Sequence, residues 1–80
     1  MIYSFLYSNS RERLERFSGE LIEFSVPARD IEEAEQLAVE RMRRYGFKYC
    51  LIFAWNIEPI PLKVVDLESE SFRIFARWFG

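Results

Sequence analysis

Residues 30–46 read DIEEAEQLAVERMRRYG, and this stretch decides the fold because it predicts one amphipathic helix over residues 30–45. Asp30 is a good N-cap, and Glu33 completes a pair that resembles a capping box. Gly46 supplies the left-handed conformation in which many helices end. Helical spacing puts the apolar residues of the stretch on one face, namely Ile31, Ala34, Leu37, Ala38, Met42 and Tyr45. We expect that face to pack against a sheet.

The last turns of this predicted helix are basic. Arg41, Arg43 and Arg44 lie at the negative end of the helix dipole, and Glu40 can pair with Arg44 at i+4. Arg41 also falls inside the apolar stripe, which leaves three arrangements open. We favour one in which its stem covers the edge of the core and its guanidinium reaches water. Alternatively, Arg41 pairs with a sheet carboxylate such as Glu23, or it joins Arg43 and Arg44 in a basic tip that faces a partner.

Two strands are predicted before the helix. Residues 1–7 alternate as a strand, and residues 20–26 form a second strand in which Ile22, Phe24 and Val26 share one face. The opposite face of the second strand is more polar and consists of Leu21, Glu23 and Ser25. This alternation is typical of an antiparallel sheet with one wet face.

Two further strands are predicted after the helix. Residues 47–57 are apolar on both faces, which favours a central position in the sheet. The prolines of residues 58–61 should break that strand, because proline cannot donate to a ladder. Residues 62–67 then resume as a strand.

Two segments leave alternatives open. Residues 11–17 form either a short helix with Leu14 and Phe17 pointing inward or a charged excursion that turns at residues 18–19. The segment 69–80 forms either a helix or a strand, and we favour a helix over 70–79. As a helix it would present one apolar face, made of Phe72, Phe75, Ala76 and Phe79.

These elements predict a single α+β domain over residues 1–80. Its sheet should have three to four strands and be largely antiparallel, with the helix 30–45 packed on one face and a C-terminal helix over 70–79. An apolar content of 50%, with eight Phe, four Tyr and two Trp, gives so short a chain enough large side chains for a core.

The residue types argue against catalysis. The chain has no His, the commonest general base, and its one thiol, Cys50, lies in an apolar strand without a basic neighbour. Glu32, Glu33 and Glu35 lie at the start of the predicted helix, where the dipole already explains them. We expect no enzyme activity, no cofactor and no metal. The N-terminus lacks the basic region of a signal peptide and no apolar run is long enough to span a membrane, so we expect a cytoplasmic protein.

Partner binding fits the composition better. Aromatic residues and Arg are enriched in protein interfaces, and the predicted C-terminal helix has more apolar surface than one packing face covers. We expect partner contacts at Arg73, Ile74, Arg77 and Trp78, and at the basic tip of Arg41, Arg43 and Arg44. Nucleic acid is a less favoured partner, because the net charge is −2 and Glu interrupts each Arg cluster.

Residues 24–38, FSVPARDIEEAEQLA, resemble a strand–helix unit of small phage and mobile-element proteins, including some anti-CRISPR inhibitors. Pro27 departs from that pattern. The resemblance implies a compact protein that occupies a surface of a larger host complex, in the host cytoplasm if phage-encoded. It supplies no functional residues to carry over.

The sequence therefore predicts a non-enzymatic protein-binding module, with a phage-encoded, anti-CRISPR-like inhibitor as its specific form. The alternative is a homodimeric structural module, and the third hypothesis is an accessory protein that binds nucleic acid.

Overall fold

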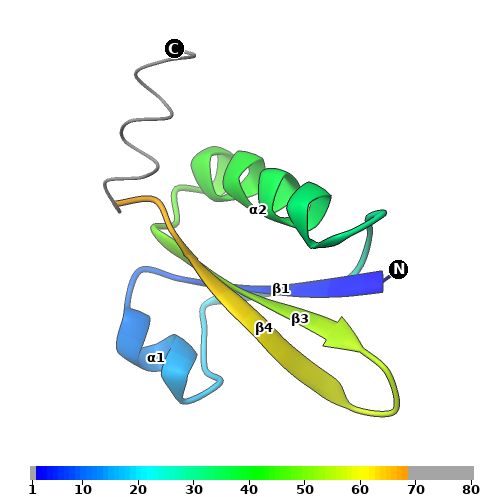
Figure 1. Cartoon of the computed structure of the whole chain (residues 1–80). Helices are drawn as coiled ribbons and strands as arrows, with labels where there is room; N and C mark the ends of the chain where they lie inside the picture. The colour runs from blue at the N-terminus through cyan, green and yellow to red at the C-terminus, as the bar shows by residue number, and fades with distance from the viewer. Residues whose placement is uncertain (1, 69–80) are drawn as a thin grey trace.

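The computed structural model describes residues 2–68 and shows a small α+β domain (Figure 1). Its elements are β1 (Ile2–Ser8), α1 (Arg11–Glu15), β2 (Leu21–Pro27), α2 (Ile31–Tyr45), β3 (Tyr49–Trp55) and β4 (Pro59–Asp66). The four strands form one antiparallel sheet in the order β2-β1-β3-β4. The predicted fold class is confirmed, whereas the predicted helix 70–79 lies outside the described residues.

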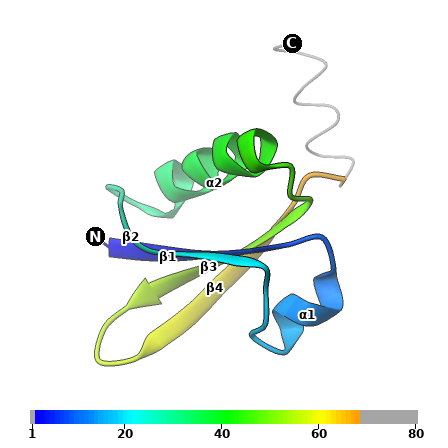
Figure 2. The ribbon, with the colours of Figure 1, turned by 180° about the vertical axis from the view of Figure 1, so that it is seen from behind.

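The two helices lie on opposite faces of the sheet (Figures 1 and 2). The long helix α2 covers one face, and the five-residue helix α1 covers part of the other. Strand β3 lies between β1 and β4, as its apolar faces predict. The face opposite α2 is called the open face below.

The predicted ends of α2 are confirmed. The Asp30 carboxylate accepts a hydrogen bond of 2.9 Å from the Glu33 backbone N–H, and Gly46 ends the helix with a φ of 81°. Ala34, Ala38 and Met42 are the buried residues of the helix. Because two of these side chains are Ala, the helix axis can approach the sheet closely.

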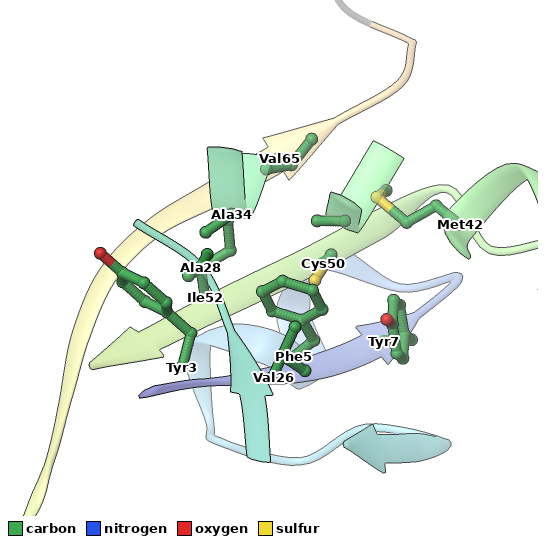
Figure 3. Packing of buried hydrophobic residues seen from close by; sticks show 11 residues of the cluster. Tyr3, Phe5, Tyr7, Val26, Ala28, Ala34, Met42, Cys50, Ile52 and Val65 are labelled. Atoms are coloured by element: carbon green, nitrogen blue, oxygen red, sulfur yellow. The ribbon is translucent and has the colours of Figure 1, made fainter. Parts of the chain in front are cut away.

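The larger core cluster lies between α2 and the sheet (Figure 3). From β1 it takes the rings of Tyr3, Phe5 and Tyr7, which alternate onto one face of the strand. Val26 comes from β2, and Cys50, Ile52 and Val65 come from the other strands. The cluster is a continuous packed layer beneath the helix.

A β-bulge in β2 overturns the predicted faces of that strand. Phe5 lies opposite Glu23 and Tyr3 lies opposite Val26, so β2 has one residue more than β1 over this interval. Glu23 and Val26 therefore share the face toward α2. The prediction that Val26 shares a face with Ile22 and Phe24 is wrong, because strict alternation does not continue through a bulge.

The smaller core cluster lies on the open face and consists of Leu6, Leu14, Leu51 and Phe53. It confirms the short helix within residues 11–17 and the inward position of Leu14. The expectation for Phe17 is wrong, because its side chain is largely exposed.

Strand β4 begins at Pro59 and not, as predicted, at residue 62. Pro59 pairs with Trp55 and Pro61 pairs with Phe53. Both prolines are tolerated because β4 is an edge strand of the sheet, where a missing N–H can face away from the ladder.

Candidate interaction surface on the open face

Several large apolar side chains are exposed on the open face, and four of them lie on or beside α1, β2 and β3. Phe17 is 61% exposed, Phe24 60%, Trp55 42% and Ile22 37%. We call these four residues the aromatic patch. Leu6 and Phe53, which are buried on the same face, form its floor. The patch follows α1 in the chain and involves strands β2 and β3.

The strand pairing places the patch residues on one face. Ile22 is the partner of Leu6, whose side chain belongs to the open-face cluster. Alternation then puts Phe24 on the same face as Ile22, ahead of the extra residue of the bulge. On the other side of β1, Trp55 alternates with Phe53.

A buried hydroxyl links Trp55 to Phe24. The Ser4 hydroxyl, which is fully buried, donates a hydrogen bond of 2.5 Å to the Phe24 carbonyl oxygen. The Ser4 Oγ in turn accepts a hydrogen bond from the Trp55 indole N–H. The indole is therefore held across β1 toward β2, and the two exposed rings belong to one surface.

Phe17 is held in an unusual backbone conformation. Its φ is 55°, in the left-handed region, and it is the only non-glycine residue of the described chain with a positive φ. The Phe17 N–H donates to the Leu14 carbonyl, and the Ser18 N–H donates to the Arg13 carbonyl, as in a Schellman motif. Glycine usually occupies this position, so a phenylalanine here is strained. Its ring contacts Phe53 with the centroids 6.0 Å apart.

A polar network lies on the opposite face, beneath α2. The Tyr7 hydroxyl donates a hydrogen bond of 2.6 Å to Glu23 Oε1, and Arg41 Nη1 lies 3.1 Å from Glu23 Oε2. The Arg41 guanidinium also lies 5.8 Å from the centroid of the Phe5 ring. Burial, and then the hydrogen bond to Glu23, raise the pKa of Tyr7 above its usual range.

This network decides between the three arrangements of Arg41. The guanidinium pairs with Glu23 on the sheet, so the favoured arrangement with a solvent-facing guanidinium is wrong. Arg43 and Arg44 are exposed, and Arg44 pairs with Glu40 at 2.9 Å as predicted. Arg73, Ile74, Arg77 and Trp78 lie outside the described residues. Partner contacts at these seven positions stay a prediction.

The thiol of Cys50 is buried in the larger core cluster. Burial raises its pKa, and the nearby Glu23 carboxylate raises it further, so the reactive thiolate is disfavoured. In residues 2–68 the His, Cys, Asp and Glu side chains form no group of three or more that could hold a metal ion. None of the helices in that range has the length and hydropathy needed to cross a membrane.

The aromatic patch was not predicted from the sequence. Strict alternation puts Phe24 on the same face as Val26, and the helical alternative for residues 11–17 points Phe17 inward, so neither pattern indicates an exposed patch. A local signal existed for Phe17, since it precedes Ser18 and Gly19 at the end of a short helix, where a left-handed residue is common. Comparisons of the chain with protein-family models, curated proteins and solved structures find no match.

Proposed function

We propose that this protein is a non-enzymatic protein-binding module that docks through its aromatic patch. One observation carries the proposal: Phe17, Phe24 and Trp55 are exposed together on one face, and Phe17 is held there in a strained conformation. Clustered exposed apolar side chains mark interaction sites, and aromatic residues are enriched in interfaces. Observed backbone strain motivates a functional hypothesis at the same position.

The surroundings of the patch suit a protein interface. Exposed charged side chains of α1 precede Phe17 in the chain, and one of them, Arg13, lies 3.9 Å from Glu20. Interfaces commonly combine an apolar centre with a polar rim. The Trp55 indole is held by its hydrogen bond to Ser4 and needs little ordering on binding, which favours affinity.

A more specific form of the proposal is a phage-encoded, anti-CRISPR-like inhibitor that occupies a surface of a host complex in the host cytoplasm. Its support is the resemblance of residues 24–38 to a strand–helix unit of such proteins. In this chain the unit contributes Phe24 to the patch and the scaffold helix α2 to the fold.

A homodimeric module is the second candidate. Within the described residues β2 pairs only with β1, and it exposes Leu21, Ile22 and Phe24 beside its unpaired edge. Exposed apolar edge strands favour pairing with another chain. A mass measurement over a range of concentrations tests this candidate, since a monomer at every concentration excludes it.

The test of the leading proposal uses the tagged full-length chain expressed in cells of its host. We expect Phe17→Gly and Phe24→Ser each to lower the recovery of the bound host protein at least tenfold. Glu32→Gln, on the exposed side of α2, is the matched control and should leave recovery unchanged. Equal recovery with all four chains, or no bound protein with the unmodified chain, would overturn the proposal.

A further inference from the structure

The two edge strands of the sheet differ in how well they are protected against pairing with another chain. On β4, Pro59 and Pro61 have no N–H to donate, and the Lys63 ammonium lies 2.7 Å from Glu35 Oε1. Prolines and lysines on an edge strand oppose the addition of a further strand. Within residues 2–68, β2 pairs only with β1, and its residues 21–26 contain neither proline nor lysine. The edge of β2 is therefore the one that can receive a further strand.

The free edge of β2 runs beside the aromatic patch. Ile22 and Phe24 face the open side, and residues 21–24 form the regular part of the strand ahead of its bulge. The only charged residue of β2, Glu23, faces α2 and pairs with Arg41. A strand added to this edge has one row of side chains beside Ile22 and Phe24 and the other row beside a paired carboxylate. The strand that fits this edge therefore alternates apolar and polar side chains.

A second copy of the chain suits this edge poorly. Residues that lie opposite each other in a sheet face the same side, so a two-fold pairing of residues 21–24 opposes Ile22 to Phe24, or one of them to itself. Opposing Ile22 to Phe24 places the Glu23 side chains of the two copies opposite each other, and like charges in that position are destabilising. Centring the pairing on Ile22 leaves an overlap of residues 21–23 alone, and centring it on Phe24 leaves that residue alone.

We propose that the edge of β2 receives an extended segment of the bound protein as an added strand, with its apolar side chains on the side of the aromatic patch. This inference rests on the proposed function, because it states which kind of segment the partner presents. Backbone hydrogen bonds to β2 supply affinity, and the row of side chains beside Ile22 and Phe24 supplies specificity. A helix does not fit this edge, because its backbone groups are already paired within the helix.

The test follows the backbone amides of the full-length chain by NMR during titration with the synthetic peptide Lys-Val-Thr-Phe-Thr-Val-Lys, blocked at both ends. Its apolar and polar side chains alternate as the inference requires. We expect hydrogen exchange of amides within residues 21–26 to slow at least fivefold at saturating peptide, and the amides of β4 to be unaffected. The control peptide has the same side chains but is N-methylated at every residue between the two lysines. It cannot donate backbone hydrogen bonds there and should not slow the exchange.

Two variants test the edge without altering the aromatic patch. Leu21 on β2 and Ile60 on β4 are 40% and 45% exposed. Both face α2, because their strand partners Tyr7 and Ala54 pack in the larger core cluster. Leu21→Lys should weaken binding of the peptide at least fivefold, because lysine on an edge strand opposes pairing. Ile60→Lys is the matched control and should leave the binding unchanged.

Several outcomes would overturn the inference: equal protection by both peptides, protection on β4 in place of β2, or no binding of the peptide. Protection of residues 21–26 that grows with protein concentration in the absence of peptide would assign the edge to a second copy, and would overturn it as well. These outcomes are distinct from failure of the proposed function. Loss of host-protein recovery with Phe24→Ser, together with no binding of the peptide, would keep the patch as a docking surface and remove only the added strand.

Discussion

At the scale of single residues, Phe17 combines a strained backbone conformation with an exposed side chain. An L-residue in the left-handed region costs about 1–2 kcal/mol relative to glycine. Here the φ of 55° belongs to a phenylalanine whose ring is 61% exposed, so burial compensates little of this cost. A residue selected for stability alone would be glycine, which is why we connect Phe17 with binding.

The strain at Phe17 is measurable by comparing two substitutions. Phe17→Gly and Phe17→Ala both remove the ring contact with Phe53, but only glycine removes the left-handed strain. We therefore expect the Gly variant to be more stable than the Ala variant by about 1 kcal/mol in urea unfolding. Equal stabilities would show that this backbone conformation is not strained.

Two glycines near the ends of the helices differ in what surrounds them. A Cβ atom on Gly19 would lie 2.6 Å from Leu6 Cδ1 and 2.8 Å from the Tyr7 carbonyl oxygen, whereas nothing lies within 4 Å of one on Gly46. We expect Gly46→Ala to lower the free energy of unfolding by about 1 kcal/mol, because of its φ alone. Gly19→Ala should cost about 2 kcal/mol, because backbone and core have to move. Urea unfolding of both variants checks the order, and a smaller loss at Gly19 would contradict it.

At the scale of elements, the polar network of Tyr7, Glu23 and Arg41 joins β1, β2 and α2. The bulge that follows Glu23 allows both Glu23 and Val26 to face the helix. A half-buried carboxylate such as that of Glu23 is favourable only while its partners are present, since removing one member leaves another polar group without its partner.

A double-mutant cycle tests this network. Glu23→Leu leaves the Arg41 guanidinium and the Tyr7 hydroxyl without their acceptor, and we expect a loss of about 2 kcal/mol in the free energy of unfolding. Combining Glu23→Leu with Arg41→Met should recover at least half of that loss, because no half-buried charge is left unpaired. Strictly additive losses in denaturant unfolding would argue against coupling between the two residues.

Some elements are predicted from the sequence better than others. The difference follows from how far apart in the chain the residues lie whose interactions determine each element. Both ends of α2 follow from neighbours within four residues, Asp30 with Glu33 and Gly46 with Met42, and both were predicted correctly. The bulge in β2 depends on the register against β1, about twenty residues away in the chain. A charged residue such as Glu23 is therefore assigned to the wet face unless its distant partners are known.

The candidate site was less predictable than the fold for a related reason. Exposure of Phe24 or Trp55 depends on what covers the open face, and no local pattern reports that. The predicted contacts at Arg73 and Trp78 were inferred from composition within one segment, where periodicity alone can be used. The patch became visible only when the pairing of Ile22 with Leu6 was known.

At the scale of the whole molecule, the two faces of the sheet contribute unequally to stability. The face beneath α2 buries most of the core, and the open face buries a smaller cluster around Leu14. We expect Ile52→Ala in the larger core to cost about 2–5 kcal/mol, and Phe24→Ser on the open face to cost less than about 1 kcal/mol. Thermal unfolding of the two variants checks this. A loss at Phe24 as large as that at Ile52 would place Phe24 in a core and remove it from the proposed binding surface.

The stability of the whole domain should fall at alkaline pH because two buried groups resist ionisation. Burial raises the pKa of both Cys50 and Tyr7 in the folded chain, and Glu23 acts in the same direction on each. In the unfolded chain the thiol ionises at about pH 8.5 and the phenol at about pH 10. Above those values the unfolded state therefore binds fewer protons than the folded state. At neutral pH both groups are protonated in both states, so they give the free energy of unfolding no pH dependence there. The free energy of unfolding declines above about pH 8.5, where the thiol of the unfolded chain ionises, and more steeply above about pH 10, by up to about 1.4 kcal/mol per pH unit for each group.

Urea unfolding between pH 7 and 10.5 measures this decline, and Cys50→Ala separates its two sources. The variant should lose the part of the decline that begins near the ordinary pKa of a thiol and keep the part that begins near the ordinary pKa of a phenol. Tyr7→Phe should show the reverse. Because each substitution also changes packing, the comparison uses the slope of stability against pH and not its absolute value. Unchanged slopes in both variants would contradict the prediction, because these groups would then ionise as readily beneath α2 as in the unfolded chain.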